Sequence, residues 1–296
     1  MDEILVVAGP TASGKTKFAV RAALESGAEI VSADSMQIYR HMDIGTAKPT
    51  HEEREGVVHH MIDVAGPNDR FSVADYVRMA SECLDDIALR KKRAVIVGGT
   101  GLYISSLINN IRFPAFDTDE MLRKQLEDEA GALGPKAMHE RLRRVDPESA
   151  GRLHENDAKR IIRALEVFLA TGETIGAHER RSRGEPSKYK YRIIGLHAER
   201  GELYRRIDAR VDAMMASGLE REAREIDEKY GRLGAPKQAI GYKEFYPYFD
   251  GRCTIGETVA SIKMETRRYA KRQMTWFRAM PDIIWIDPLD KNHRML

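Results

Sequence analysis

Eight residues near the N-terminus have types and spacing that suit the binding of phosphate groups. They read Gly9-Pro10-Thr11-Ala12-Ser13-Gly14-Lys15-Thr16. In such a loop the backbone N–H groups face anionic oxygens, the lysine adds a mobile positive charge, and the final hydroxyl can hold Mg²⁺ between two phosphate groups. Because a compact diphosphate presents the same oxygens as a nucleoside triphosphate, the loop predicts a phosphate compound with Mg²⁺ and leaves its identity open.

The segments around this loop are those needed to position it. An apolar run at 4–8 predicts a strand, and residues 15–25 predict a helix whose positive N-terminal end faces the same anion. A second strand is predicted at 28–32, which gives a right-handed parallel unit. Functional groups in such sheets lie just beyond the carboxyl ends of the strands, where this chain carries Asp34. Position alone fits a functional carboxylate and a turn cap equally well.

A further apolar run at 94–97 is typical of a central parallel strand, and it ends in Gly98-Gly99-Thr100-Gly101. Phosphate-loop ATPases commonly hold their metal with an aspartate at such a strand end. The absence of an acid here counts against a motor or hydrolase and leaves a kinase possible. The glycines allow the backbone to approach a ligand closely, so Thr100 is the side chain there that can form a hydrogen bond.

The periodicity changes from about residue 113, where helices are predicted near 118–130, 135–145 and 157–171, with no strand before 192–196. This pattern predicts an α/β fold, a parallel sheet core like that of P-loop NTPases with an inserted all-helical domain. We expect the core to comprise residues 1–113 and 191–296 and the insertion to comprise 114–190.

Two clusters of bases indicate contact with nucleic acid. Lys159, Arg160 and Arg163 lie on one predicted helix of the insertion, and the segment 263–278 holds six bases and one acid beside aromatic residues. Such clusters suit RNA phosphate contacts with base stacking. They also fit a solvated helix face, and the formal net charge of only +2 means that any RNA surface must come from local patterning.

Composition narrows the class of protein further. The two cysteines, Cys83 and Cys253, lie far apart, which predicts neither a disulfide framework nor a zinc site. No apolar run approaches the roughly 18 residues of a membrane span, so we expect a cytoplasmic protein that does not bind membranes. The residues then leave three classes open: a small-metabolite kinase, a group transferase acting on RNA, and a nucleotide-dependent switch that only binds RNA. Asp34 suits the switch least.

Seven segments, in order along nearly the whole chain, carry a resemblance to a known family. Besides the phosphate loop they are Ser32–Tyr39 (SADSMQIY), Asp43–Pro49 (DIGTAKP), Gly98–Tyr103 (GGTGLY), Arg163–Val167 (RALEV), Ala239–Glu244 (AIGYKE) and Lys271–Trp276 (KRQMTW). Together they closely resemble the bacterial tRNA dimethylallyltransferases, also called tRNA isopentenyltransferases. One departure is visible, because the family usually reads Asp-Pro-Gln-Arg where this chain has Asp157-Ala158-Lys159-Arg160.

The resemblance implies transfer of a dimethylallyl group from its diphosphate to the exocyclic N6 amine of the adenosine 3′ of the anticodon. It implies that residues Gly9, Pro10, Thr11, Ala12, Ser13, Gly14, Lys15 and Thr16 hold diphosphate and not ATP, together with Arg210, and that Thr16 binds Mg²⁺. Asp34 would act as general base, and Thr100 would contact the target nucleotide. Lys15 and Arg210 would stabilise the leaving diphosphate.

The implied partners are dimethylallyl diphosphate and the anticodon stem-loop of tRNA, bound by a monomer. By resemblance the tRNA contacts come from Asp34, Ser35, Met36, Gln37, Thr100, Arg123, Lys159, Arg160, Arg163, Lys237, Gln238, Tyr242, Lys243, Lys271, Arg272 and Gln273. At Lys159 a lysine contact replaces the usual glutamine. The stacked target base must flip out to reach a buried diphosphate. Related enzymes that prenylate free adenosine nucleotides are the alternative, and they would have little use for a basic insertion.

Overall fold

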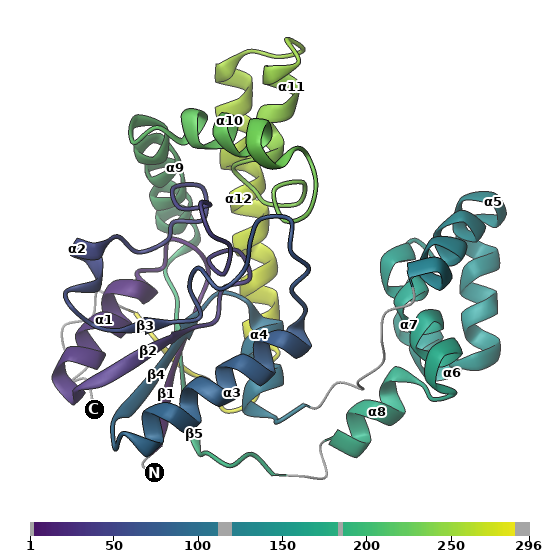
Figure 1. Ribbon diagram of the computed structural model, residues 1–296, viewed down its shortest axis with the longest axis horizontal. Coiled ribbons are helices and arrows are strands. Elements are labelled where there is room, and N and C mark those ends of the chain that lie inside the picture. The colour runs from purple at the N-terminus through teal and green to yellow at the C-terminus, as the bar shows by residue number, and fades with distance from the viewer. Residues whose placement is uncertain (1–2, 112–119, 183–185, 288–296) are drawn as a thin grey trace. The chain divides into compact units, whose positions relative to one another are not determined.

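The computed structural model describes residues 3–111, 120–182 and 186–287, which belong to two compact units. One unit is built from Met1–Ile108 together with Lys188–Leu296, and the other from Asn109–Ser187. Figure 1 draws both units with their elements labelled. Among the described residues, no helix is both long and apolar enough to cross a membrane.

The first unit is organised around one sheet of six parallel strands in the order β3-β2-β4-β1-β5-β6. The strands are β1 Ile4–Ala8, β2 Ala28–Ser32, β3 His59–His60, β4 Arg93–Gly98, β5 Tyr191–Leu196 and β6 Ile284–Ile286. Central parallel strands are covered on both faces and therefore read as continuous apolar runs. The predicted parallel α/β core is confirmed.

Alternate side chains of β1 enter two different cores. Ile4, Val6 and Ala8 pack with residues of α3 (Val73–Leu89) and α4 (Gly101–Ile108). Figure 1 shows these two helices on one face of the sheet. Val7 packs on the opposite face against α1 (Lys15–Ser26). This alternation follows from the period of two in a strand. It fixes the phosphate loop, because the loop connects β1 directly to α1.

The remaining helices of this unit follow β5 or precede β3. They are α2 His51–Arg54, α9 Arg200–Ala216, α10 Leu219–Tyr230, the 3₁₀ helix η1 Lys243–Phe245, α11 Tyr246–Phe249 and α12 Ile255–Arg278. Capping boxes start two long helices, with Ser72 and Asp75 at the start of α3 and Thr254 and Glu257 at the start of α12. The helices α4 and α10 were not predicted from the sequence.

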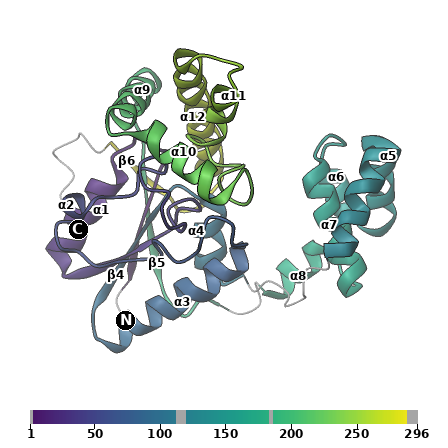
Figure 2. The same cartoon turned by 45° about the horizontal axis from the view of Figure 1, so that its top comes forward.

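A second core joins the segment after β2 to the helices that follow β5. Ile38 and Met42 pack with Val211 of α9, Leu219 of α10 and Ile262 of α12. The helices α9 and α12 are neighbours, and Figure 2 shows them beside α10 and α11. This packing brings α9 and α12 to the carboxyl end of the sheet, where the phosphate loop lies.

The second unit is all-helical among its described residues. It consists of α5 Glu120–Val145, α6 Pro147–Arg152, α7 Ala158–Thr171 and α8 Ile175–Ser182. The helices expected at 118–130 and 135–145 form α5, which is interrupted at Gly134 (φ 80°, ψ 171°) before Pro135. Leu126, Met138 and Leu165 are among the buried residues of a separate core, so this unit does not depend on the sheet for its apolar packing.

Candidate active site

The phosphate loop has a backbone suited to holding an anion. Ala12 (φ 61°) and Gly14 (φ 86°) adopt left-handed conformations, which turn successive N–H groups towards one side of the loop. Helix α1 starts at Lys15 without a side-chain cap, so its first N–H groups keep their donor capacity for a ligand. The loop and the helix terminus therefore supply donors at the same place.

Two cationic side chains face this loop. The Lys15 ammonium lies 3.2 Å from the carbonyl oxygen of Pro10. Burial lowers the pKa of Lys15 to about 8, with nearby Asp34 opposing the shift and Arg210 adding to it. Burial also lowers the pKa of Arg210, opposed by Glu53. Neither cation forms an ion pair with a carboxylate of the described residues, so both are available to neutralise a bound anion.

Asp34 and Thr100 lie side by side at the ends of β2 and β4. The Oδ1 atom of Asp34 accepts hydrogen bonds from the N–H groups of Met36 (2.9 Å) and Gln37 (3.4 Å). Its Oδ2 atom accepts none from the described residues. The hydroxyl of Thr100 accepts a hydrogen bond from the N–H of Ser35 at 2.9 Å. Asp34 thus caps a turn with one oxygen and presents the other for chemistry.

A cavity of about 260 Å³ connects the phosphate loop and Arg210 with Asp34, and Thr100 is not among the residues that line it. Among the predicted site residues its lining includes Thr11, Lys15, Thr16, Asp34, Ser35, Met36, Gln37, Arg210, Gln238, Lys243, Arg272 and Gln273. Another part of the wall was not predicted from the sequence. Its apolar residues are Val211, Met214, Ala239, Ile240 and Ile262, and Thr266 and Tyr269 lie with them. The apolar stripe of α9, which contains Val211 and Met214, was the one available signal for that wall.

Gln273 and Tyr242 are more deeply placed than the other residues expected to contact RNA. Gln273 is 5 % exposed and is hydrogen-bonded to the backbone of Thr11 and Gly99. Tyr242 is 1 % exposed, and its hydroxyl donates to Glu222 at 2.6 Å. The same Glu222 accepts hydrogen bonds from the backbone at 43–45. Tyr242 therefore supports the turn that borders the cavity.

The bases of α12 divide into two groups. Lys263 pairs with Asp212 (2.6 Å), Arg267 with Asp208 (2.8 Å) and Arg268 with Glu265 (2.6 Å). Lys271, Arg272 and Arg278 are exposed and form no ion pair with the described residues. Only the end of the basic helix thus offers free positive charge, which narrows the surface expected to bind RNA.

The predicted tRNA-contacting residues of the insertion lie in the second unit. Arg123 pairs with Glu127 at 3.3 Å and Arg163 with the buried Glu166 at 2.8 Å, whereas Arg160 lies 3.6 Å from Asp157. Lys159 and Arg160 are exposed on α7, and Lys237 is exposed in the first unit. These bases present charge to solvent.

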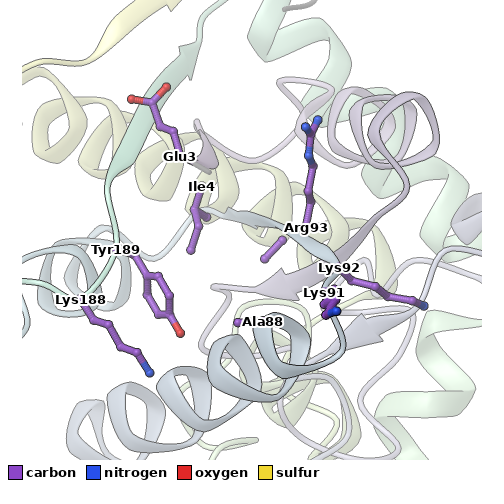
Figure 3. A pocket seen from close by; sticks show the side chains of 9 residues that line it. Glu3, Ile4, Ala88, Lys91, Lys92, Arg93, Lys188 and Tyr189 are labelled. Atoms are coloured by element: carbon purple, nitrogen blue, oxygen red, sulfur yellow. The ribbon is translucent and has the colours of Figure 1, made fainter. Parts of the chain in front are cut away.

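A larger cavity, of about 490 Å³, lies at the opposite edge of the sheet, where β1 and β4 begin (Figure 3). Lys91, Lys92, Arg93 and Lys188 line it with Tyr189. Among these cations Lys92 pairs with Glu29 and Lys188 with Asp85, each at 2.7 Å. Active sites of parallel α/β sheets form beyond the carboxyl ends of the strands, so the smaller cavity is the candidate active site.

The parallel sheet, with a phosphate loop between its first strand and helix, places the chain among the P-loop-like α/β proteins. Within that class the chain belongs to the IPP transferase family, whose family model matches residues 37–280. The resemblance found in the sequence is therefore confirmed.

Relatives of similar length support this assignment. The chain is 44 % identical to a tRNA dimethylallyltransferase of Acetivibrio thermocellus, over all of this chain and 96 % of that protein. It is 47 % identical to one of Geobacillus thermodenitrificans, over 98 % of this chain and 91 % of that protein.

Two solved structures are also similar. A tRNA isopentenylpyrophosphate transferase from Bacillus halodurans has a TM-score of 0.71 at 42 % identity, over 97 % of this chain and 90 % of that one. A eukaryotic dimethylallyltransferase acting on tRNA has a TM-score of 0.83 at 28 % identity, over 97 % of this chain and 74 % of that one.

Proposed function

We propose that this protein is a tRNA dimethylallyltransferase, which moves a dimethylallyl group from its diphosphate to the N6 amine of the adenosine 3′ of the anticodon. The observation that carries the proposal is the single cavity that joins the phosphate loop to Asp34 across an apolar wall. A prenyl donor with a diphosphate group and a five-carbon chain matches the phosphate loop and the apolar wall of this cavity. The names of the relatives support the same activity.

The diphosphate end of the donor would bind at the phosphate loop. The loop amides, Lys15 and Arg210 supply positive potential where negative charge develops as the allylic C–O bond breaks. Thr16 lines the cavity in the first turn of α1, so its hydroxyl fits the role of a protein ligand for Mg²⁺, with diphosphate and water supplying the other oxygens. When bound, Mg²⁺ would neutralise part of the charge of the leaving group.

Asp34 is suited to accept the proton of the adenine amine. The N6 nitrogen is a weak nucleophile because its lone pair is delocalised into the ring, so it must be oriented and deprotonated as the new bond to carbon forms. The Oδ2 atom is available for this proton, while Oδ1 is held by the N–H of Met36. The electron pair of the broken C–O bond leaves with the diphosphate, and the proton passes to Asp34.

The helical second unit favours tRNA over free adenosine nucleotides as the acceptor. Its exposed Lys159 and Arg160 suit the phosphates of an RNA stem, as do Lys271 and Arg272 of the core unit. A free nucleotide would need neither set. The core would then receive the flipped adenosine while other bases hold the stem.

The test offers the protein two donors and two acceptors in the presence of Mg²⁺. Prenyl-labelled dimethylallyl diphosphate or γ-labelled ATP is incubated with unmodified tRNA or with AMP. Transfer of prenyl label to tRNA is the expected result. Prenyl transfer to AMP in preference to tRNA would support the nucleotide prenyltransferase, and phosphate release from ATP without prenylation would restore the kinase or switch.

A further inference from the structure

Gln273 lines the active-site cavity and joins the phosphate loop to the loop after β4. Its Oε1 atom accepts a hydrogen bond from the N–H of Thr11 in the phosphate loop at 2.9 Å. Its Nε2 atom donates to the carbonyl oxygen of Gly99, in the loop after β4, also at 2.9 Å. These partners lie 262 and 174 residues away in the sequence, so one buried amide of α12 connects segments that the chain brings together only on folding.

The two loops belong to the parts of the site that would bind the two different substrates. Thr11 belongs to the loop that would hold diphosphate, whereas Gly99 directly precedes Thr100. The hydroxyl of Thr100 accepts a hydrogen bond from the N–H of Ser35, which is next to the proposed base Asp34 in the sequence. Tyr269, one turn before Gln273 on α12, lines the same cavity as Gln273. The Gln273 amide therefore lies between the loop that would bind the prenyl donor and the segment that would bind the acceptor adenosine.

The contact requires an amide in one orientation. The Thr11 N–H needs an acceptor and the Gly99 carbonyl needs a donor, and neither a carboxylate nor an ammonium group supplies both. The fit is close on the side of Gly99, where an added Cβ would lie 2.3 Å from Nε2. Since the amide is buried, loss of either bond would leave a backbone group without a partner.

We propose that Gln273 is a positioning residue that makes the binding of diphosphate and of tRNA cooperative. A diphosphate that orders the phosphate loop also fixes Thr11, and through Gln273 it fixes the Gly99–Thr100 segment that receives the adenosine. The inference rests on the proposed function, and it gives Gln273 a role between two loops in place of a direct contact with RNA. Linkage makes the effect reciprocal, so tRNA must tighten diphosphate binding by the same factor.

The experiment measures the dissociation constant of unmodified tRNA with and without saturating inorganic diphosphate and Mg²⁺. For the unchanged chain we expect diphosphate to tighten tRNA binding by a factor within the range of roughly 5 to 150 that is typical of two linked sites. In Gln273→Met, which keeps the length of the side chain and loses both hydrogen bonds, this factor should fall below about 2.

A second substitution and a matched control distinguish loss of the Gln273 connection from a general destabilisation of α12. Gly99→Ala places a methyl group against the Gln273 amide and should also abolish the cooperativity. The double variant should lose no further cooperativity, because both substitutions break the same connection. Thr275→Ala changes an exposed position of the same helix and should keep the full factor. Thermal unfolding verifies that each variant folds, and Gln273→Glu replaces Gln273→Met if the latter does not.

Two results would overturn the inference. One is a cooperativity factor in Gln273→Met that stays within twofold of normal, and the other is an unchanged chain that binds both ligands independently. If the unchanged chain bound neither diphosphate nor tRNA, the proposed function itself would fail, and this inference with it.

Discussion

At the scale of single residues, the ligand-free site is electrostatically unfavourable. Lys15 and Arg210 share one cavity, and burial lowers the pKa of each. Because the pKa of Lys15 is below that of an unfolded lysine, the unfolded chain binds more protons between about pH 8 and about pH 10, and the stability of the ligand-free chain rises with pH in that range. A bound diphosphate compensates for the burial of these two positive charges, because both cations then face an anion.

Diphosphate affinity should decrease as the pH rises through about 8, the pKa of Lys15. Above that pH the free chain has lost the Lys15 proton, and binding must restore it, which weakens affinity by up to roughly tenfold per pH unit. Lys15→Arg keeps its charge throughout and should give a flatter profile. Calorimetric titration of both proteins at several pH values measures the difference, and parallel profiles would count against Lys15 as the titrating group.

Asp34→Asn should bind both substrates normally and lower the rate of transfer by roughly 10² to 10⁴, the usual contribution of a general base. The amide keeps the shape and the acceptor for the Met36 N–H, and it removes the proton acceptor. Single-turnover rates on bound tRNA are the measurement. Asp86→Asn, an exposed change on α3 outside the cavity, is the matched control and should react at the normal rate. A rate for Asp34→Asn within threefold of normal would remove Asp34 from this role.

At the scale of elements, α12 connects the packing of the core to the proposed RNA surface. Its first half is fixed to α9 by the pairs of Lys263 with Asp212 and Arg267 with Asp208. Its second half carries Gln273 at the cavity and Lys271 and Arg272 towards solvent. One helix therefore carries both the buried Gln273 amide and the exposed cationic side chains.

Replacing Lys271 and Arg272 by Gln should weaken tRNA binding and reduce its dependence on salt. Each phosphate contact that is lost should lower the slope of log affinity against log salt by about 0.7 to 0.9. The matched control replaces Lys263 and Arg268, which are already paired with acids, and should leave the slope nearly unchanged. Binding curves at several salt concentrations provide the comparison. Equal slopes in both double variants would mean that the end of α12 is only a solvated face.

Glu29 connects β2 to three other segments of the first unit. This side chain of β2 is 4 % exposed and contacts Arg90 (2.6 Å), Lys92 (2.7 Å) and His60 (2.7 Å). Glu29→Gln should lower the free energy of unfolding by on the order of 2 to 3 kcal/mol, because the cations lose a buried counter-charge. Glu25→Gln, which breaks only the exposed pair with Arg21, should cost less than about 1 kcal/mol in the same urea titrations.

The stabilisation by Glu29 should also depend on pH. The hydrogen bond from Arg90 is the main cause that holds the pKa of Glu29 well below its ordinary value of 4.5. The contribution is therefore present above about pH 4.5 and decreases as the pH falls towards the lower folded pKa. Urea titrations at neutral and acid pH should show the difference between Glu29→Gln and the unchanged chain shrinking in acid. A constant difference would contradict this account.

Local patterns predicted the parts of the site that depend on neighbouring residues. The spacing of Gly9 to Thr16 requires only a strand, a turn and a helix, and the position of Asp34 follows from the end of β2. The connection made by Gln273 could not be predicted, because its two partners lie far away in the sequence. The apolar wall was missed for the same reason, since Met214 and Ile262 come from helices that meet only through tertiary packing.

At the scale of the whole molecule, the two compact units have separate apolar cores. Leu165→Ala, at 1 % exposure in the core of the helical unit, should destabilise that unit by about 2 to 5 kcal/mol through a cavity. We expect weaker tRNA binding with unchanged diphosphate binding. Leu169→Ala, 45 % exposed on the same helix, is the matched control. Calorimetry with each ligand separates the effects, and a large loss of diphosphate affinity in Leu165→Ala would contradict independence of the units.

The helical unit is inserted into the chain, so it is covalently joined to the core at both of its ends. A tRNA molecule held by the helical unit is therefore tethered to the catalytic core, and the encounter of its loop with the cavity becomes an intramolecular event. Its rate then depends on an effective concentration set by the two connections and not on the amount of tRNA in solution. Weak contacts at each unit can in this way add up to strong retention of one RNA molecule.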